Sequence, residues 1–118
     1  MSTRAIPLSL HGALEIIAAP AIMVAPFLLD FGQAATVITV TLGALLLGLA
    51  LQVEGPRRTV PLSAHAGFDY TLAFVALIGG LAIGAFTDEW AAGVFLVGVG
   101  VAQVALTAAT RFSAPRGA

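Results

Sequence analysis

Two histidine–carboxylate pairs are the residues of this chain best suited to chemistry. The stretch "PLSLH", which ends at His11, recurs as "PLSAH", which ends at His65, and an acid follows each histidine by four residues, Glu15 and Asp69 respectively. On a helix this spacing puts both side chains on one face, close enough to touch. Imidazole and carboxylate groups form hydrogen bonds, bind metals and transfer protons. We expect the four side chains to form one cluster.

The sequence leaves three interpretations of this cluster open. The pairs can be hydrogen-bond contacts between two spans, or side chains that reach the membrane interface. They can be a zinc or iron site, although helical carboxylate sites favour Glu-x-x-His and this order is His-x-x-x-Glu. They can also be a proton or cation relay. The lack of any charged residue in the middle of the predicted spans argues against a relay. We expect Gln103 and Tyr70 to lie near the depth of Asp69, where each can hydrogen-bond the cluster.

The composition indicates a membrane protein. The 118 residues are 59% hydrophobic and 9% charged, and the mean hydropathy is +1.03, which is more apolar side chain than one small soluble core can hide. The absence of cysteine excludes disulfides and thiolate chemistry. A net charge of -1 with few basic residues argues against nucleic-acid binding. No nucleophile triad, phosphate loop or zinc motif is present in the sequence, so we expect neither enzymatic activity nor a cofactor.

Uncharged runs predict four membrane spans. About 20 apolar residues cross the hydrocarbon of a bilayer. The first span reaches back through Glu15 to about Ser9, because the uncharged run after Glu15 is too short by itself. The four predicted spans cover residues 9–29, 31–53, 70–87 and 90–110. The prolines at 7 and 61 suit helix starts, which we expect Ser9 and Ser63 to cap.

An internal repeat organises the chain. Residues 6–53 and 60–112 each contain the histidine–acid stretch, a span, an acidic turn and a second span. A duplicated hairpin keeps its orientation in the membrane, so the two halves are parallel repeats. The second half needs about three extra residues to align 34–43 with 91–100. We predict an all-α integral membrane four-helix bundle, a single domain over 1–118.

The arginines predict the orientation. Arg4 precedes the first span, while the other four lie between the second and third spans or after the fourth. All five therefore fall on one side, which the positive-inside rule makes cytoplasmic, with both termini inside a bacterial inner membrane. One alternative is that Arg4 and the first apolar stretch form a cleaved signal peptide; Glu15 and the repeat count against it.

A family resemblance covers the first half best. The stretch "IMVAPFLLDFG" at 22–32, followed by "AATVITVTLGALLLGLAL", resembles the SPW repeat family of small bacterial membrane proteins, with Ala25, Pro26 and Phe27 as its Ser/Ala-Pro-aromatic signature. The second half instead reads "LIGGLAIGAF". The resemblance implies a multi-span protein of unassigned function and supplies no active site.

The expected role is therefore structural or accessory, in the lipid bilayer, as a homo-oligomer or beside a larger membrane protein. The alternative is a small transport unit, or one that handles protons or a metal, built on His11, Glu15, His65 and Asp69. Small residues four apart suit close helix packing, within the bundle or between chains. These pairs are Ala44 with Gly48, Gly80 with Gly84, and Gly98 with Ala102.

Overall fold

Four long helices make up almost all of the structure, a computed structural model that describes residues 4–53 and 62–112. The helices are α1 (Leu8–Leu28), α2 (Gln33–Val53), α3 (Leu62–Phe86) and α4 (Trp90–Ala109). Each is long and apolar enough to cross a membrane. The predicted all-α fold with four spans is confirmed. Two short strands, β1 (Ile6–Pro7) and β2 (Thr110–Arg111), pair in parallel at one end of the bundle.

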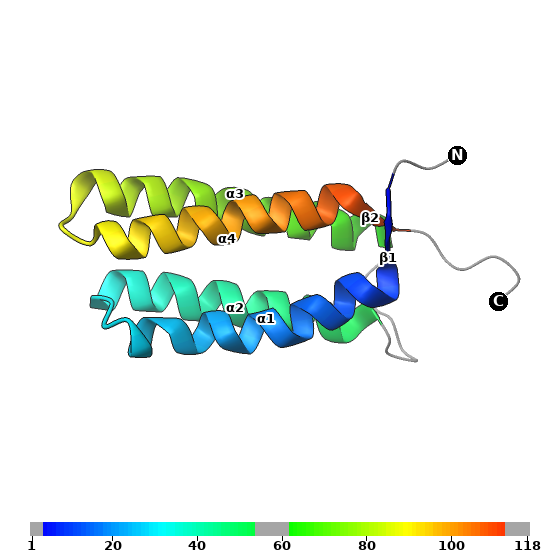
Figure 1. The fold of residues 1–118 in the computed structure, drawn as a ribbon, viewed down its shortest axis with the longest axis horizontal. Helices are drawn as coiled ribbons and strands as arrows, with labels where there is room; N and C mark the ends of the chain where they lie inside the picture. Colours follow the sequence, from blue (N-terminus) through cyan, green and yellow to red (C-terminus); the bar gives the residue numbers. More distant parts are fainter. Residues whose placement is uncertain (1–3, 54–61, 113–118) are drawn as a thin grey trace, which may run out of the picture.

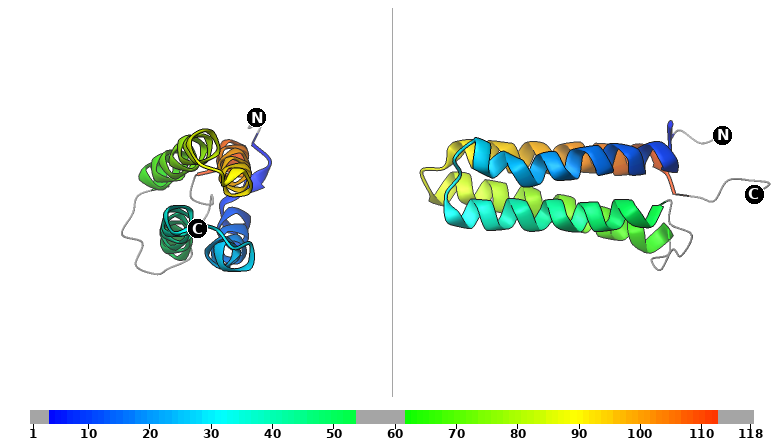
Figure 2. Two further views of the ribbon diagram at one scale, coloured as in Figure 1. Left: turned by 90° about the vertical axis from the view of Figure 1, so that its left-hand side faces the viewer. Right: turned by 90° about the horizontal axis from the view of Figure 1, so that it is seen from below.

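The bundle consists of two antiparallel hairpins laid side by side, α1 with α2 and α3 with α4 (Figure 1). Seen along its axis, the four helices occupy the corners of a square, so α1 lies diagonally opposite α3 (Figure 2). The helices pack closely within each hairpin and more sparsely between hairpins. The first helices of the two repeats run in the same direction, which brings their histidine–acid stretches to the same end.

Glycines allow the close packing within each hairpin. A Cβ atom at Gly43 of α2 would lie 3.0 Å from the Ala19 carbonyl oxygen of α1, and one at Gly100 of α4 would lie 2.8 Å from that of Ala73 in α3. The repeat aligns Gly43 with Gly100, and Ala19 with Ala73. The two hairpins thus use the same backbone contact at equivalent positions, as expected for a duplicated unit.

The turns at the other end of the bundle are built differently from the helix starts. Helix α1 ends at Leu28 with Leu29 as its C-cap; Asp30 follows with a φ of 55°, and the Phe31 N–H donates to the Pro26 carbonyl oxygen at 2.9 Å. This is the Schellman arrangement, with aspartate at the position that glycine usually takes. The Gly32 N–H donates to the Glu89 carboxylate and so joins the two turns.

The predicted serine caps are wrong. Helix α1 begins at Leu8, Pro7 is its N-cap residue, and the cap has no side-chain hydrogen bond. The reason is that Pro7 also belongs to β1, whose extended pairing with β2 fixes the residue at which the helix begins. Ser9 is therefore already inside α1, and Ser63 is inside α3. The proline at 61 lies outside the described residues.

The surface of the bundle is apolar and its buried groups include charged ones. Large hydrophobic side chains point outward along the helices, among them Ile17, Phe27, Ile78 and Phe86. Two acids and both histidines are buried inside. This distribution, together with four helices of spanning length, is that of a membrane protein.

Candidate functional site

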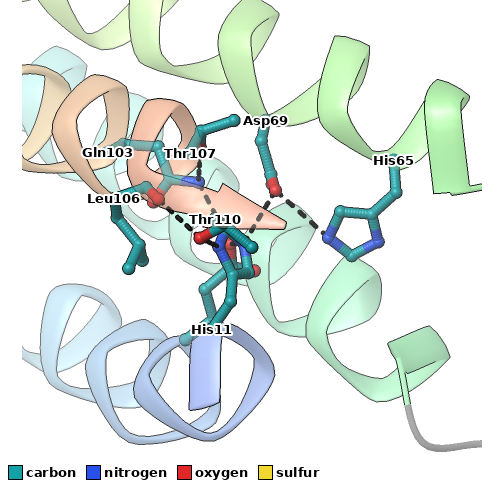
Figure 3. A network of polar contacts seen from close by, with 8 residues as sticks. His11, His65, Asp69, Gln103, Leu106, Thr107 and Thr110 are labelled. Atoms are coloured by element: carbon teal, nitrogen blue, oxygen red, sulfur yellow. Dashed lines mark hydrogen bonds and ion pairs between the residues drawn. The ribbon is translucent and has the colours of Figure 1, made fainter. Parts of the chain in front are cut away.

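The two histidine–acid pairs lie together at the end of the bundle that carries β1 and β2; Figure 3 shows His11, His65 and Asp69 there. His11, Glu15, His65 and Asp69 are each at most 2% exposed. The first two come from α1 and the others from α3, so the cluster connects helices that face each other across the diagonal of the bundle. The structure therefore brings all four predicted residues into one buried site.

His11 is at the centre of the site. Its Nε2 lies 2.9 Å from Asp69 Oδ2 and also contacts the Glu15 carboxylate. Its Nδ1 lies 2.8 Å from Thr110 Oγ1, and that hydroxyl donates its only proton to the Leu106 carbonyl oxygen at 2.6 Å. Thr110 must therefore accept from His11, which assigns a proton to Nδ1. The Nε2 atom is left facing two carboxylates.

The second histidine is less well satisfied. His65 Nε2 lies 3.1 Å from Asp69 Oδ2, but the contact lacks the angular geometry of a hydrogen bond, and the atom has no hydrogen-bond partner. Asp69 Oδ1 and Glu15 Oε2 are likewise buried without a partner among the described residues. Buried polar atoms are rarely left in this condition. The cluster therefore contains three polar atoms that are available to a ligand.

The asymmetry of the site has its origin in the second helix of each hairpin. On α4, the Gln103 amide donates to Glu15 Oε1 at 3.1 Å and also lies 3.5 Å from the Thr107 hydroxyl. The repeat aligns Gln103, Thr107 and Thr110 with Leu46, Ala50 and Val53 of the first half, and all six are buried. Among the described residues, the second repeat supplies the polar partners: Gln103 contacts Glu15 and Thr110 contacts His11, both in the first repeat.

Aromatic rings cover the site toward the end of the bundle. The Phe112 ring lies 5.1 Å from the His11 ring and 5.7 Å from the His65 ring, between centroids. The two imidazoles themselves are 5.8 Å apart in an edge-to-face arrangement. Phe112 directly follows β2, whose pairing with β1 holds it against the bundle.

The two further predicted members behave differently. Gln103 joins the cluster through Glu15, as expected. Tyr70 does not join it: its side chain is half-buried, and the part of the chain that the structure describes contains no hydrogen bond between its hydroxyl and the cluster. The helix turns about 100° per residue, so Tyr70 points away from the face that carries Asp69.

Three participants were missed by the sequence reasoning: Thr107, Thr110 and Phe112. A signal for the threonines was available, because Gln103, Thr107 and Thr110 follow the i, i+4, i+7 pattern of one helix face. The packing of Phe112 depends on β1 and β2, two-residue strands that leave no pattern in the sequence.

Two grooves lie along the seams between the hairpins. The first has a volume of about 660 Å³ between α1 and α4, and the second about 460 Å³ between α2 and α3. Apart from Glu15 and Gln103, the first is lined by apolar side chains, many of them on the outer surface. It therefore opens sideways toward lipid and is not a polar passage through the bundle.

Comparisons of the chain with protein-family models, with curated proteins and with solved structures found no match.

Proposed function

We propose that this chain is a structural or accessory protein of a bacterial cytoplasmic membrane, without catalytic activity, which acts by assembling with a second copy or with a larger membrane protein. The observation that carries the proposal is the pair of grooves between the hairpins. A bundle whose packing was complete in itself would close these seams. Open apolar grooves of this size suit another helix or lipid chains.

Small residues strengthen this reading of the grooves. Gly98 and Ala102 line the α1–α4 groove, and Ala44 and Gly48 line the α2–α3 groove. A Cβ atom at Gly98 or Gly48 would meet no atom of the described residues within 4 Å, so these glycines are not needed for packing among the four helices. Small residues at an open groove are the usual means by which membrane helices approach each other.

The proposed orientation places the site near the cytoplasmic face, with both termini inside. Arg111 in β2 and Arg4 just before β1 are exposed at the end that carries the site, while Asp30 and Asp88, in the turns that follow α1 and α3, are exposed at the other end. The three remaining arginines lie outside the described residues. This distribution supports the orientation through the positive-inside rule.

Cysteine cross-linking in native membranes tests the proposed assembly, and the chain suits it because it has no cysteine of its own. We expect Gly98→Cys and Gly48→Cys to form cross-linked species whose mass identifies a second copy or a partner. Gly67→Cys is the matched control, because a Cβ there also meets nothing within 4 Å and Gly67 lines neither of the two grooves. Equal cross-linking at all three positions, or none, would contradict the proposal.

We also propose a relationship to the SPW repeat family. The support is the stretch at 22–32, with Ala25, Pro26 and Phe27 in the last turn of α1. A homologous chain with a Pro-aromatic step in both halves would connect this sequence to that family.

A further inference from the structure

We propose that His11, Glu15, His65 and Asp69 bind one divalent metal ion, zinc in a four-coordinate site. This goes beyond the proposed accessory role and does not rest on the grooves, although Glu15 also lines the α1–α4 groove. Each residue offers one ligand atom, and the four atoms all lie within 4.8 Å of one another. In a tetrahedral zinc site with bonds of 2.0–2.2 Å, neighbouring ligand atoms are about 3.4 Å apart. The four atoms are thus within about 1.4 Å of the separation that a tetrahedral site requires.

Three buried atoms of the cluster have no hydrogen-bond partner within residues 4–53 and 62–112, which is the observation that points to a ligand. They are His65 Nε2, Glu15 Oε2 and Asp69 Oδ1, each on a side chain at most 2% exposed. His65 Nε2 is near Asp69 Oδ2 without the angle of a hydrogen bond. An imidazole nitrogen and a carboxylate oxygen lie close together without hydrogen-bond geometry when both point at a common third atom.

The surroundings of His11 match those of a metal-binding histidine. Such a histidine donates its other ring N–H to an acceptor that fixes the tautomer and the ring orientation. Here Nδ1 donates to the Thr110 hydroxyl, which the Leu106 carbonyl holds in the accepting orientation. Gln103 orients Glu15 in the same way, through its hydrogen bond to Oε1. Nε2 is therefore the nitrogen with which a neutral His11 ring would bind the metal, in place of its contacts with Asp69 and Glu15.

Charge and ligand type select a divalent transition metal. Two carboxylates carry two negative charges, which a divalent ion neutralises when both imidazoles are neutral; an uncompensated charge inside the membrane is costly. Two imidazole nitrogens with two carboxylate oxygens suit zinc, and ions that prefer only oxygen ligands are disfavoured. The ring of Phe112 and the buried setting leave little room for water, which favours a closed four-coordinate site.

Metal analysis of the full chain, purified in detergent or nanodiscs and loaded with ZnCl₂ before desalting, tests the inference. We expect about one zinc per wild-type chain, and a loss of at least about tenfold in affinity for Asp69→Asn and His65→Gln. The matched control is Asp30→Asn, the same chemical change at an exposed turn whose positive φ asparagine tolerates. This variant should retain the metal.

A second measurement uses only the wild-type chain, so it does not depend on whether the variants fold. Chelation should lower the melting temperature and ZnCl₂ should restore it, while Co²⁺ in place of zinc should give the intense visible absorption of a tetrahedral complex. Substoichiometric zinc that Asp69→Asn does not change, or a melting temperature insensitive to chelator and metal, would overturn the inference. That outcome would make the cluster a metal-free hydrogen-bond network and would leave the cross-linking test of the accessory role unaffected.

Discussion

Replacing Thr110 by valine removes one hydroxyl from the site and little else. The side chain is 0% exposed, and valine has nearly the same shape, so no cavity is expected. The hydroxyl accepts from His11 Nδ1 at 2.8 Å and donates to the Leu106 carbonyl oxygen at 2.6 Å. Its loss leaves the His11 N–H buried without an acceptor.

The expected cost of Thr110→Val is about 1 kcal/mol of unfolding free energy. A buried donor that loses its partner costs about 1–3 kcal/mol in soluble proteins. Within membranes, measured side-chain hydrogen bonds average about 0.6 kcal/mol, with a maximum near 1.7. Denaturation of the bundle in mixed micelles by added SDS, followed by circular dichroism, measures differences of this size.

Thr107→Val is the matched control. Thr107 is equally buried, but its hydroxyl lies 3.5 Å from the Gln103 amide and does not contact His11, so we expect a change below about 0.5 kcal/mol. Combining Thr110→Val with His11→Leu should cost less than the sum of the single changes. Equal effects of the two threonine substitutions, or additivity with His11→Leu, would refute the assigned hydrogen bond.

Three further predictions concern the acid, the helix packing and the orientation. Glu15→Gln should be mild in metal-free protein, because its amide oxygen still accepts from Gln103; Glu15→Leu should cost about 1–3 kcal/mol, and less when His11 is apolar too, as SDS denaturation would show. Gly93→Ala should cost about 1–3 kcal/mol, since a Cβ there would lie 2.8 Å from the Gly80 carbonyl oxygen, whereas Gly98→Ala should stay within about 0.5 kcal/mol. A reporter enzyme that works only outside the cytoplasm should be active when it is fused at residue 32 or 88. If only a reporter that works in the cytoplasm is active at these positions, the proposed orientation is wrong.

The four helices and the clustering of the two histidine–acid pairs were predictable from the sequence. They follow from span length, charge and the repeat, which do not depend on how the helices pack. The repeat then implied that His11 and His65 lie at one end, because a duplicated hairpin keeps its direction.

The pattern of contacts inside the cluster was not predictable in the same way. His11 contacts both acids while His65 approaches only Asp69, and this difference comes from side chains on α4 that have apolar counterparts on α2. Which helix lies across the diagonal is a property of the packed bundle. Tyr70 was misplaced because adjacency in sequence was taken as adjacency in space, although neighbours on a helix point in different directions.

Solid-state NMR on the chain in lipid bilayers tests the central claim, which is that a histidine of one hairpin and an acid of the other meet inside the membrane. The chain has only two histidines and three aspartates, so labelling histidine ring nitrogens with ¹⁵N and aspartate Cγ with ¹³C gives spectra with few signals. Because His65 Nε2 also lies 3.1 Å from Asp69 Oδ2, the measurement uses His65→Gln, which leaves His11 as the only histidine of the chain. With His11 Nε2 2.9 Å from Asp69 Oδ2, the nitrogen should lie within about 4 Å of the carboxylate carbon and give strong ¹⁵N–¹³C dipolar dephasing, which adding Asp69→Asn should abolish. Absence of dephasing in the His65→Gln chain would place His11 away from Asp69 and contradict the account.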